Sequence, residues 1–420
     1  MTYDEALLWI NSMPAFSAKR YDIKGIEKLL EVLGNPQDKL NFIHIAGTNG
    51  KGSTSAFCSS SLIESGLKTG LFISPYIIDY RERIQIDGKM ISKFDLLEMI
   101  TLIKSHVESL KKQNVVLSHF DIITSIAIIY FCKEACDIVV METGLGGRLD
   151  STNVIKSPKV SIITHISYDH TDVLGNDILD IAREKAGILK PGSLCVCCND
   201  QENYVKKVIS SRCEELGINM IESYFPSDVI SNENGSSWVF DNVRYKTKLI
   251  GEHQIKNAML AITALLNLKI DKSCIKRGIA KASLPVRLEK VWDNPIIILD
   301  GAHNPDGVAV MSKSIALFKK RPIVCLLSML KRKDYKSALK QISFKIDKLI
   351  ITEMDFDDVL PANELAKAAV QLGFDIEVIL EPKEALKCAK KIAKEDGMVI
   401  VFGSLYFASQ VRKGFFDKLN

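Results

Sequence analysis

Short apolar runs alternate with amphipathic helical patterns along most of this chain. In the first part of the sequence, the runs that predict strands are 42–46, 69–73, 138–141, 160–164 and 194–198. The segments between them, such as 94–110 and 122–133, place apolar residues at helical spacing. This alternation predicts an α/β fold built on a doubly wound parallel sheet.

The pattern changes between residues 200 and 250. A turn cluster at 231–237 precedes two short apolar stretches, 238–240 and 243–245. We interpret this region as a small antiparallel excursion attached to the sheet.

A second α/β series follows a break at Pro285. Its predicted strands are 296–299, 323–327, 348–351, 376–379 and 398–402. A chain of 420 residues is long for one hydrophobic core. We therefore expect two domains, 1–285 and 286–420.

Composition excludes several function classes. Apolar residues at 47% and charged residues at 25% are typical of a soluble globular protein. A net charge of +4 is too small to indicate a nucleic-acid surface. The sequence shows no signal peptide and no apolar run of membrane-spanning length, so we expect a cytoplasmic protein. The sequence shows no coiled-coil pattern and no exposed apolar stripe, so we expect a monomer. The ten cysteines fit buried reduced thiols better than a zinc site.

The most informative motif follows the first predicted strand. It reads Gly47-Thr48-Asn49-Gly50-Lys51-Gly52-Ser53-Thr54, and a helix is predicted from 55 to 65. Glycines let backbone N–H groups approach phosphate oxygens, and a helix N-terminus adds positive potential. Lys51 can reach the β- and γ-phosphates of a nucleotide, while Ser53 or Thr54 can hold a magnesium ion.

The spacing of this loop differs from the ordinary P-loop. That pattern needs glycine where this chain has Ile45, and Ser or Thr where it has Gly52. A simple P-loop kinase is therefore disfavoured. A glycine-rich turn without a ligand is the alternative, but the strand–loop–helix context favours phosphate binding.

Three other predicted strands end in polar side chains. Ser74 follows the second strand, Glu142 the third, and Asp169-His170 come soon after the fourth. Since the carboxyl ends of parallel strands share one edge, we expect Ser74, Glu142 and His170 to converge there. These side chains suit Mg²⁺ or Mn²⁺, although each taken alone also fits a purely structural or solvated role.

Two further regions carry candidate chemistry. Lys185 lies in a helical pattern, where a solvated lysine is the simplest interpretation of the pattern alone. Asp300 and His303 follow the strand 296–299 and are well placed to face a nucleotide.

Six separated motifs occur in order along nearly the whole chain, namely 44–54, Ser74-Pro75 with 81–84, 142–153, Asp169-His170 with 184–188, 251–257 and 300–305. In this ordered set the chain resembles the folylpolyglutamate synthase/dihydrofolate synthase family of Mur-type ligases. The resemblance implies an N-terminal P-loop-type parallel-sheet ATPase domain and a smaller C-terminal Rossmann-like α/β domain.

The resemblance also implies an ATP-dependent ligase. The carboxylate of dihydropteroate or of a reduced folate attacks the γ-phosphate of ATP, and the amino group of L-glutamate then displaces phosphate from the acyl phosphate. In such a reaction the protein mainly positions the reactants and neutralises charge.

Residue roles carry over by position. The resemblance implies catalytic roles for Lys51, Glu142, His170 and Lys185, the last as a CO₂-derived carbamate. It implies two Mg²⁺ sites, with Mn²⁺ as a possible substitute, at Ser53, Ser74, Glu142 and His170. It implies that ATP contacts Gly47, Thr48, Asn49, Gly50, Lys51, Gly52, Ser53, Thr54, Asn257, Arg287, Asp300 and His303. It implies that the pterin substrate contacts Gly25, Ser118, His119, Phe120, Asp121, Leu149, Asp150 and Ser151.

Two departures from the family pattern stand out. The chain has Phe120-Asp121 where the family commonly has Phe-Glu, a change on the pterin side. It has Pro285-Val286-Arg287 where the family commonly has Pro-Gly-Arg, and valine lacks the φ freedom of glycine.

Two alternative functions remain at this point. A ligase for peptidoglycan precursors normally carries an additional N-terminal domain, whereas only a short segment precedes the phosphate loop here. A nucleotide-binding protein without ligase chemistry would not need Lys51, Glu142, His170 and Lys185 together.

Overall fold

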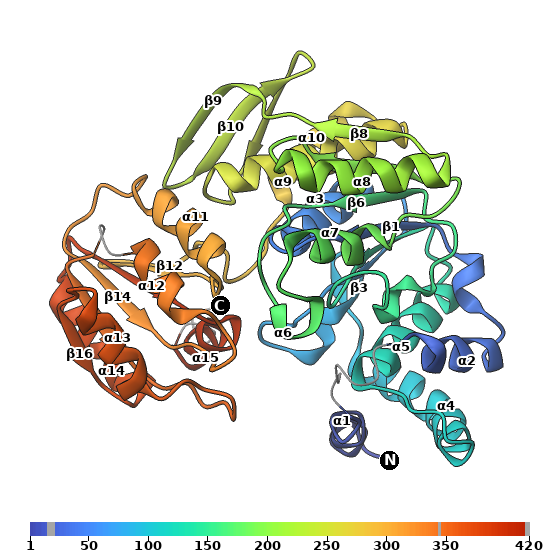
Figure 1. Ribbon diagram of the computed structural model, residues 1–420, viewed down its shortest axis with the longest axis horizontal. Helices are drawn as coiled ribbons and strands as arrows, with labels where there is room; N and C mark the ends of the chain where they lie inside the picture. Colours follow the sequence, from blue (N-terminus) through green and yellow to red (C-terminus); the bar gives the residue numbers. More distant parts are fainter. Residues whose placement is uncertain (15–21, 343–345, 416–420) are drawn as a thin grey trace. The chain divides into compact units, whose positions relative to one another are not determined.

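The computed structural model describes residues 1–14, 22–342 and 346–415. It divides into two compact units, whose elements Figure 1 colours along the chain. Unit 1 comprises Met1–Ser227, Phe240–Tyr245 and Lys256–Ala282. Unit 2 comprises Asp228–Val239, Lys246–Ile255 and Ser283–Asn420.

Unit 1 is built on one large sheet with the strand order β4-β3-β2-β5-β1-β6-β7-β8. Its strands are β1 (Phe42–Ala46), β2 (Thr69–Phe72), β3 (Ile84–Ile86), β4 (Lys89–Met90), β5 (Ile138–Glu142), β6 (Val160–Ile163), β7 (Leu194–Cys198) and β8 (Met220–Ser223). The six neighbouring strands β2, β5, β1, β6, β7 and β8 pair in parallel. β3 and β4 extend the sheet beyond β2 as an antiparallel edge. The predicted doubly wound parallel sheet is therefore confirmed, with β1 and β7 at the predicted residues.

Helices surround this sheet. They are α1 (Tyr3–Asn11), α2 (Lys24–Val32), η2 (Pro36–Lys39), α3 (Lys51–Glu64), η3 (Tyr80–Arg83), α4 (Lys93–Lys112), α5 (His119–Lys133), η4 (Ser151–Val154), α6 (Thr171–Leu174), α7 (Ile178–Ala186), α8 (Asn203–Leu216), α9 (Glu252–Asn267) and α10 (Lys272–Lys281). Every residue of β1 and β5 is buried, which requires cover on both faces of the sheet.

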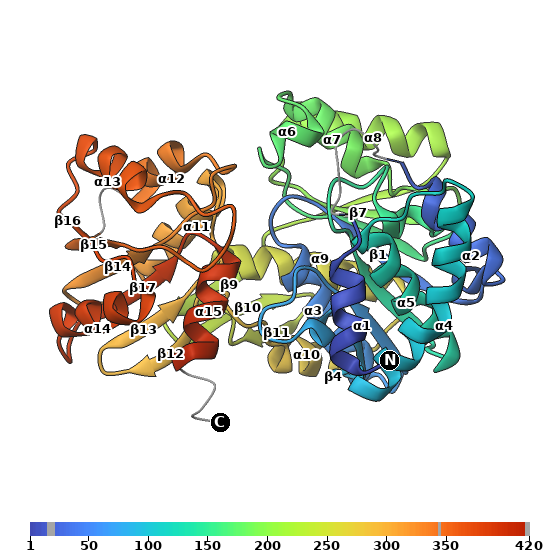
Figure 2. The same ribbon diagram turned by 90° about the horizontal axis from the view of Figure 1, so that it is seen from below.

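Helices α1, α2, α4 and α5 lie side by side (Figure 2) and share one apolar core with the sheet. Ile26, Ile100 and Ile126 from three of these helices are fully buried there, together with Phe72 of β2. A second core lies between α7, α8 and the strands β6 and β7. Burial of these apolar side chains is the main term that stabilises unit 1.

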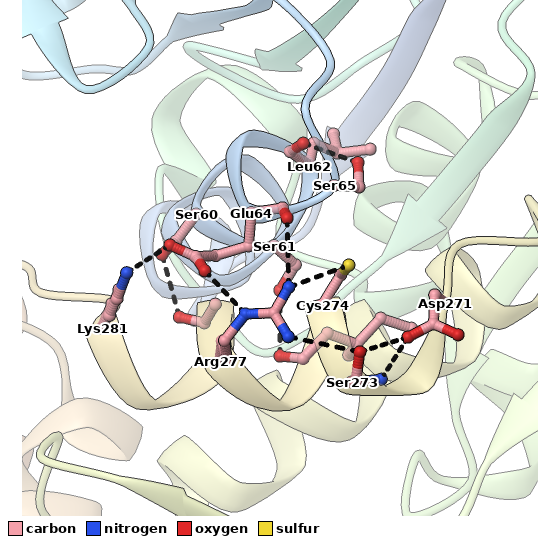
Figure 3. A network of polar contacts seen from close by, with 12 residues as sticks. Ser60, Ser61, Leu62, Glu64, Ser65, Asp271, Ser273, Cys274, Arg277 and Lys281 are labelled. Atoms are coloured by element: carbon pink, nitrogen blue, oxygen red, sulfur yellow. Dashed lines mark hydrogen bonds and ion pairs between the residues drawn. The ribbon is translucent and has the colours of Figure 1, made fainter.

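Helix α10 lies against α3, the helix that follows the phosphate loop (Figure 3). A Cβ atom on Gly278 would overlap the backbone of Ser61, so the two helices approach closely only because residue 278 is glycine. Glu64 of α3 accepts hydrogen bonds from Arg277 (2.9 Å) and Lys281 (2.5 Å) of α10. The position of α3 therefore depends on α10.

The region between 220 and 250 contains the small excursion that the sequence predicted. β8 joins the main sheet, whereas β9 (Ser227–Asn232), β10 (Gly235–Phe240) and β11 (Val243–Thr247) form a separate sheet. The excursion therefore has a three-stranded sheet of its own. Trp238 of β10 and Tyr245 of β11 are fully buried.

Unit 2 contains the second α/β series, with the strand order β12-β13-β17-β14-β15-β16. Its strands are β12 (Glu289–Asp293), β13 (Ile296–Leu299), β14 (Ile323–Leu327), β15 (Lys348–Ile351), β16 (Ile376–Val378) and β17 (Met398–Phe402). Its helices are α11 (Pro305–Ile315), α12 (Tyr335–Ile342), α13 (Ala362–Gln371), α14 (Pro382–Ala393) and α15 (Leu405–Phe415). β12 pairs antiparallel with β13 at the edge, and the other neighbours are parallel.

In the described ranges, no helix combines the length and the apolar character needed to cross a lipid bilayer.

Candidate active site

The phosphate loop leads directly into helix α3. This helix begins at Lys51, one turn earlier than predicted, because Gly50 adopts a left-handed conformation (φ 93°) and accepts the first helical hydrogen bond from Thr54 (2.9 Å). Lys51, Gly52 and Ser53 therefore form the first turn, whose N–H groups lack partners inside the helix. Gly50 has no side chain to cap them, which leaves this end of α3 suited to an anion.

Two glycines of the loop permit close approaches that a side chain would block. A Cβ atom on Gly47 (φ 152°) would overlap Oγ1 of Thr164, and one on Gly50 would overlap the side-chain oxygen of Asn257. Asn257, predicted to contact ATP, thus lies against the loop from α9.

The loop is also tied to the segment that follows β6. The Thr48 N–H donates to the carbonyl of His165 (2.8 Å), and Thr48 Oγ1 donates to the carbonyl of Ser167 (2.9 Å). The N–H of Ser167 donates back to Thr48 Oγ1 (3.1 Å). These contacts hold the backbone of the loop in place.

Two lysines far apart in sequence meet at the same loop carbonyl. Lys51 Nζ donates to the carbonyl oxygens of Gly47 (3.0 Å) and Thr48 (3.3 Å). Lys185 Nζ, from the last turn of α7, donates to the Gly47 oxygen as well (2.8 Å). The interpretation of Lys185 as a solvated helical lysine is therefore wrong, since its side chain is buried in the loop.

The surroundings of Lys185 disfavour its charged form. Burial, with a smaller contribution from the charge of Lys51, lowers the pKa of Lys185 to about 7. Asp169 and Asp150 oppose this change more weakly. A large fraction of Lys185 is consequently neutral at physiological pH.

Ser74 and Glu142 meet at the carboxyl ends of β2 and β5, which are neighbours in the sheet. The N–H of Ser74 donates to Oε2 of Glu142 (3.2 Å), as the sequence predicted from the shared edge. The Glu142 side chain is buried, and so is Ser53 in the first turn of α3. A buried carboxylate and a hydroxyl beside a phosphate loop match the few protein ligands that Mg²⁺ takes next to phosphate oxygens.

His170 lies on the loop after β6, where it precedes α6 with a φ of 51°. Its ring approaches Asp169, with 3.9 Å between Nε2 and Oδ2. Across residues 1–14, 22–342 and 346–415, no three His, Cys, Asp or Glu side chains cluster as a complete metal site. A metal at this edge would therefore depend on hydroxyl and phosphate oxygens in addition to Glu142 or His170.

On the predicted pterin side, three residues converge through Asp121. Its Oδ2 accepts from the N–H and the hydroxyl of Ser118, both at 2.8 Å, which caps α5. Its Oδ1 accepts from the Ser151 hydroxyl at 2.6 Å. Helix α5 begins at His119 rather than 122 because this capping box starts it earlier.

His119 and Phe120 occupy the first turn of α5. The Phe120 ring lies against Gly144, where an added Cβ atom would be 2.6 Å from its edge, and its centroid is 5.8 Å from that of Phe72. His119 Nε2 lies 3.1 Å from the hydroxyl of Tyr80. Burial, and secondarily the charge of Arg83, lowers the pKa of His119 to about 4.

Asp150 is held by a buried chain of hydrogen bonds. Its Oδ1 accepts from the Thr152 hydroxyl (2.5 Å), whose oxygen lies 2.8 Å from His44 Nε2. Since the hydroxyl has one proton and gives it to Asp150, His44 must donate through Nε2. Burial lowers the pKa of His44 to about 3, which keeps the imidazole neutral, and burial raises the pKa of Asp150.

The remaining predicted substrate residues have mainly structural surroundings. Gly25 lies within α2, and a Cβ atom there would be 2.5 Å from the carbonyl oxygen of Val116. Leu149 is half-buried in the turn before η4.

In unit 2, Asp300 organises the turn after β13. Its carboxylate accepts from the N–H groups of Leu288 and Ala302, both at 2.8 Å, and burial raises its pKa against the opposing charge of Arg287. His303 Nδ1 lies 2.8 Å from the carbonyl of Gly301. Arg287, Asp300 and His303 are thus gathered at one end of this sheet.

Several residues of the site were not predicted from the sequence. Thr164 faces Gly47, Ser167 binds Thr48, and Thr152 with His44 supports Asp150. His44 and Thr152 lie within the motifs 44–54 and 142–153, but these give no sign that the two side chains meet, because they are 108 positions apart. No local pattern marks Thr164 or Ser167.

Comparison with known proteins places this site in a family. A model described as the Mur ligase middle domain matches residues 45–265, and one described as the Mur ligase, glutamate ligase domain matches residues 286–405. The dihydrofolate synthase/folylpolyglutamate synthase of Bacillus subtilis (strain 168) is 35% identical, and the folylpolyglutamate synthase of Lacticaseibacillus casei is 32% identical; each alignment covers 98% of this chain and 98% of the relative. The solved structure of Mycobacterium tuberculosis folylpolyglutamate synthase complexed with ADP has a TM-score of 0.91 at 27% identity, with 98% of both chains covered. On this full-length similarity, the chain belongs to the folylpolyglutamate synthase/dihydrofolate synthase family of Mur ligases.

Proposed function

We propose that this protein is an ATP-dependent ligase that joins L-glutamate to dihydropteroate, to reduced folates, or to both. The observation that carries the proposal is the meeting of Lys51 and Lys185 at the Gly47 carbonyl, beside the uncapped start of α3. The names of the full-length relatives supply the substrate class.

The proposed reaction has two steps. A carboxylate oxygen of the acceptor attacks the γ-phosphorus of ATP, the bond to ADP breaks, and an acyl phosphate forms. The amino group of glutamate then attacks the acyl carbon, phosphate leaves, and the amine proton passes to solvent. The carboxylate needs this activation because it is a poor electrophile.

The loop residues would bind the nucleotide. N–H groups at the start of α3 and the Lys51 ammonium would hold the phosphate oxygens, with Asn257 against the same loop. From unit 2, Arg287, Asp300 and His303 are the proposed further contacts to ATP.

Ser53, Ser74 and Glu142 fit a magnesium ion bound together with ATP, and His170 is the proposed ligand of a second ion, for which Mn²⁺ is also suitable. Such ions would neutralise charge on the transferring phosphoryl group. Glu142 accepts the Ser74 N–H, which keeps both groups at the edge of the sheet.

Lys185 is the proposed carbamate. Its neutral amine can attack CO₂, which forms an N–C bond and releases one proton. A pKa near 7 supports this step, because a protonated lysine is not a nucleophile. The product is an anion that can join the metal ligands beside Lys51.

The pterin is proposed to bind beside Phe120, where its flat ring can stack, with Asp121, Ser151 and Asp150 as polar neighbours. Asp121 is one carbon shorter than the glutamate common in the family, so this position bears on the choice of acceptor.

The test is phosphate release from ATP and Mg²⁺ with L-glutamate, using dihydropteroate and tetrahydrofolate as separate acceptors. Product mass must increase by one glutamyl residue, and omission of glutamate is the control. Turnover on both acceptors would establish a bifunctional ligase, and turnover on one would name the activity. Absence of turnover on both would overturn the proposal.

A further inference from the structure

The motif Arg81-Glu82-Arg83 has three charged side chains with different surroundings. Arg81 donates from Nε (3.0 Å) and Nη2 (2.7 Å) to the two carboxylate oxygens of Asp79. Glu82 accepts from the N–H groups of Ile77, Ile78 and Asp79 at 2.7 to 2.9 Å. Arg81 and Glu82 therefore stabilise the loop itself.

Arg83 has a different environment. Its guanidinium lies over the rings of Tyr76 (5.2 Å) and Tyr80 (5.6 Å), and those rings are 5.5 Å apart. Its Nε atom is buried without a hydrogen-bond partner. Within the described residues, no carboxylate forms an ion pair with Arg83.

The groups around this cation are neutral. Tyr80 shares a hydrogen bond with His119, and the low pKa of His119, caused by burial and then by Arg83, keeps that ring uncharged near pH 7. Burial raises the pKa of Tyr80. Aromatic faces attract a guanidinium but leave its N–H groups unsatisfied, so the site lacks an acceptor of opposite charge.

The place of Arg83 in the fold connects the two halves of the proposed active site. The N–H of Ile73 donates to the Arg83 carbonyl (3.1 Å), and the next residue, Ser74, contacts Glu142. Tyr80, on which the guanidinium lies, contacts His119 at the start of α5, next to Phe120. Arg83 is thus located between the phosphate-side edge and the proposed pterin side.

We propose that Arg83 is a substrate-binding residue whose guanidinium binds a carboxylate of the pterin-bearing acid. The inference rests on the proposed function, because that reaction brings a carboxylic acid to this edge of the sheet. A planar fork of N–H donors matches a carboxylate, and the tyrosine rings hold the fork before the substrate arrives.

The test compares binding of pteroic acid with binding of its carboxamide, which lacks the charge, to the full chain and to Arg83→Gln. The acid should bind about ten- to a hundredfold more weakly to Arg83→Gln, while the affinity for the carboxamide should change little. The KM for ATP should also stay unchanged. Equal weakening of both ligands, or of neither, would overturn the inference.

Two further variants keep the result interpretable. Arg83→Lys retains a cation over the tyrosines but lacks the planar fork of donors, so it should lose part of the preference for the acid. This variant keeps the test valid if Arg83→Gln does not fold. Arg81→Gln removes a neighbouring arginine that already pairs with Asp79, and it should leave the preference intact. If the unaltered chain shows no glutamate-dependent turnover, the proposed function fails and this inference with it. Normal turnover with an unchanged preference in Arg83→Gln overturns the inference alone.

Discussion

The side chain of Lys185 reaches the carbonyl oxygen of Gly47, 138 positions earlier in the chain, with 2.8 Å between Nζ and oxygen. This contact makes the last turn of α7 part of the phosphate loop. It also places two lysines on one carbonyl, since Lys51 lies 3.0 Å from the same oxygen. Burial, and secondarily the charge of Lys51, lowers the pKa of Lys185 to about 7, so Lys185 is the one of the two that is readily neutral.

Replacement of Lys185 by alanine should lower turnover by about 10²- to 10³-fold, since the proposed carbamate anion beside the phosphate loop would be lost. Short carboxylates such as acetate should restore part of the activity by occupying the space of the carbamate. Phosphate release with and without added carboxylate measures both effects.

Lys185→Arg is the matched control for the carbamate. It keeps a cation and fills the space, so it should be inactive and should not respond to acetate. The unaltered protein in ¹³C-bicarbonate should show a carbamate NMR signal that Lys185→Arg lacks. Full activity of Lys185→Ala would rule out the carbamate.

Lys185 should also make folding stability depend on pH. Its pKa is about 7 in the folded chain and 10.5 in the reference state, so the unfolded chain binds more protons between these values. The free energy of unfolding should therefore be highest above pH 10.5, where Lys185 is neutral in both states. It should fall as the pH decreases toward 7, because only the unfolded chain takes up the proton readily. In CO₂-free buffer, Lys185→Met should be more stable than the unaltered chain near pH 7, by on the order of a few kcal/mol, because one pKa unit is about 1.4 kcal/mol. Urea unfolding at several pH values tests this, and a stability difference that does not shrink as pH rises would contradict it.

Gly50→Ala should weaken ATP binding more than its backbone strain alone explains. Gly50 and Gly66 both have positive φ (93° and 85°), but an added Cβ atom meets Asn257 only at Gly50, and at Gly66 it has open space. Both substitutions should cost about 1–2 kcal/mol of stability from the left-handed conformation. Only Gly50→Ala should raise the KM for ATP, and equal KM values for the two variants would show that the close approach is unimportant.

The strands were the most predictable part of the fold. β1 and β7 match their predicted residues because buried parallel strands appear as continuous apolar runs between turns. The helix starts at Lys51 and His119 were missed because neither is set by apolar spacing. Gly50, in a left-handed conformation, precedes the first, and the capping box of Ser118 and Asp121 starts the second. The turn cluster and the short apolar stretches also indicated the small excursion that forms β9 to β11, but they did not show that its three strands form a sheet of their own.

Sequence motifs marked the residues that are proposed to carry chemistry but not those that position them. Lys51 and Glu142 stand out at strand ends, whereas Thr164 and Thr152 look like ordinary strand or turn residues until the fold brings Gly47 and Asp150 to them. Conversely, the sequence marked Val286 as a departure from the family but did not show how the fold accommodates it. It adopts a φ of 58° where the family commonly has glycine, and its fully buried side chain offsets part of that strain.

Thr152→Val should affect the acceptor side through Asp150. Valine keeps the shape but leaves the His44 N–H without its acceptor and removes one donor to Asp150, so stability should fall by about 1–3 kcal/mol. The KM for the pterin acceptor should rise while the KM for ATP stays constant. Thr152→Ser keeps the hydroxyl and is the matched control. If both variants behave alike, the methyl group matters and the hydrogen bonds do not.

Gly278→Ala tests whether α10 sets the position of the phosphate-loop helix. In a helix interior, alanine is favoured over glycine by about 1 kcal/mol, so local propensity predicts stabilisation. The added methyl group would instead overlap the backbone of Ser61, and overpacking of this kind costs about 1–3 kcal/mol. Gly414→Ala in α15, where the methyl group has open space, is the control and should be neutral or slightly stabilising. Because α3 starts at Lys51, its displacement by α10 should also weaken ATP binding in Gly278→Ala and not in Gly414→Ala. A loss of stability with unchanged KM for ATP would mean that α3 adjusts along its length and keeps its first turn in place.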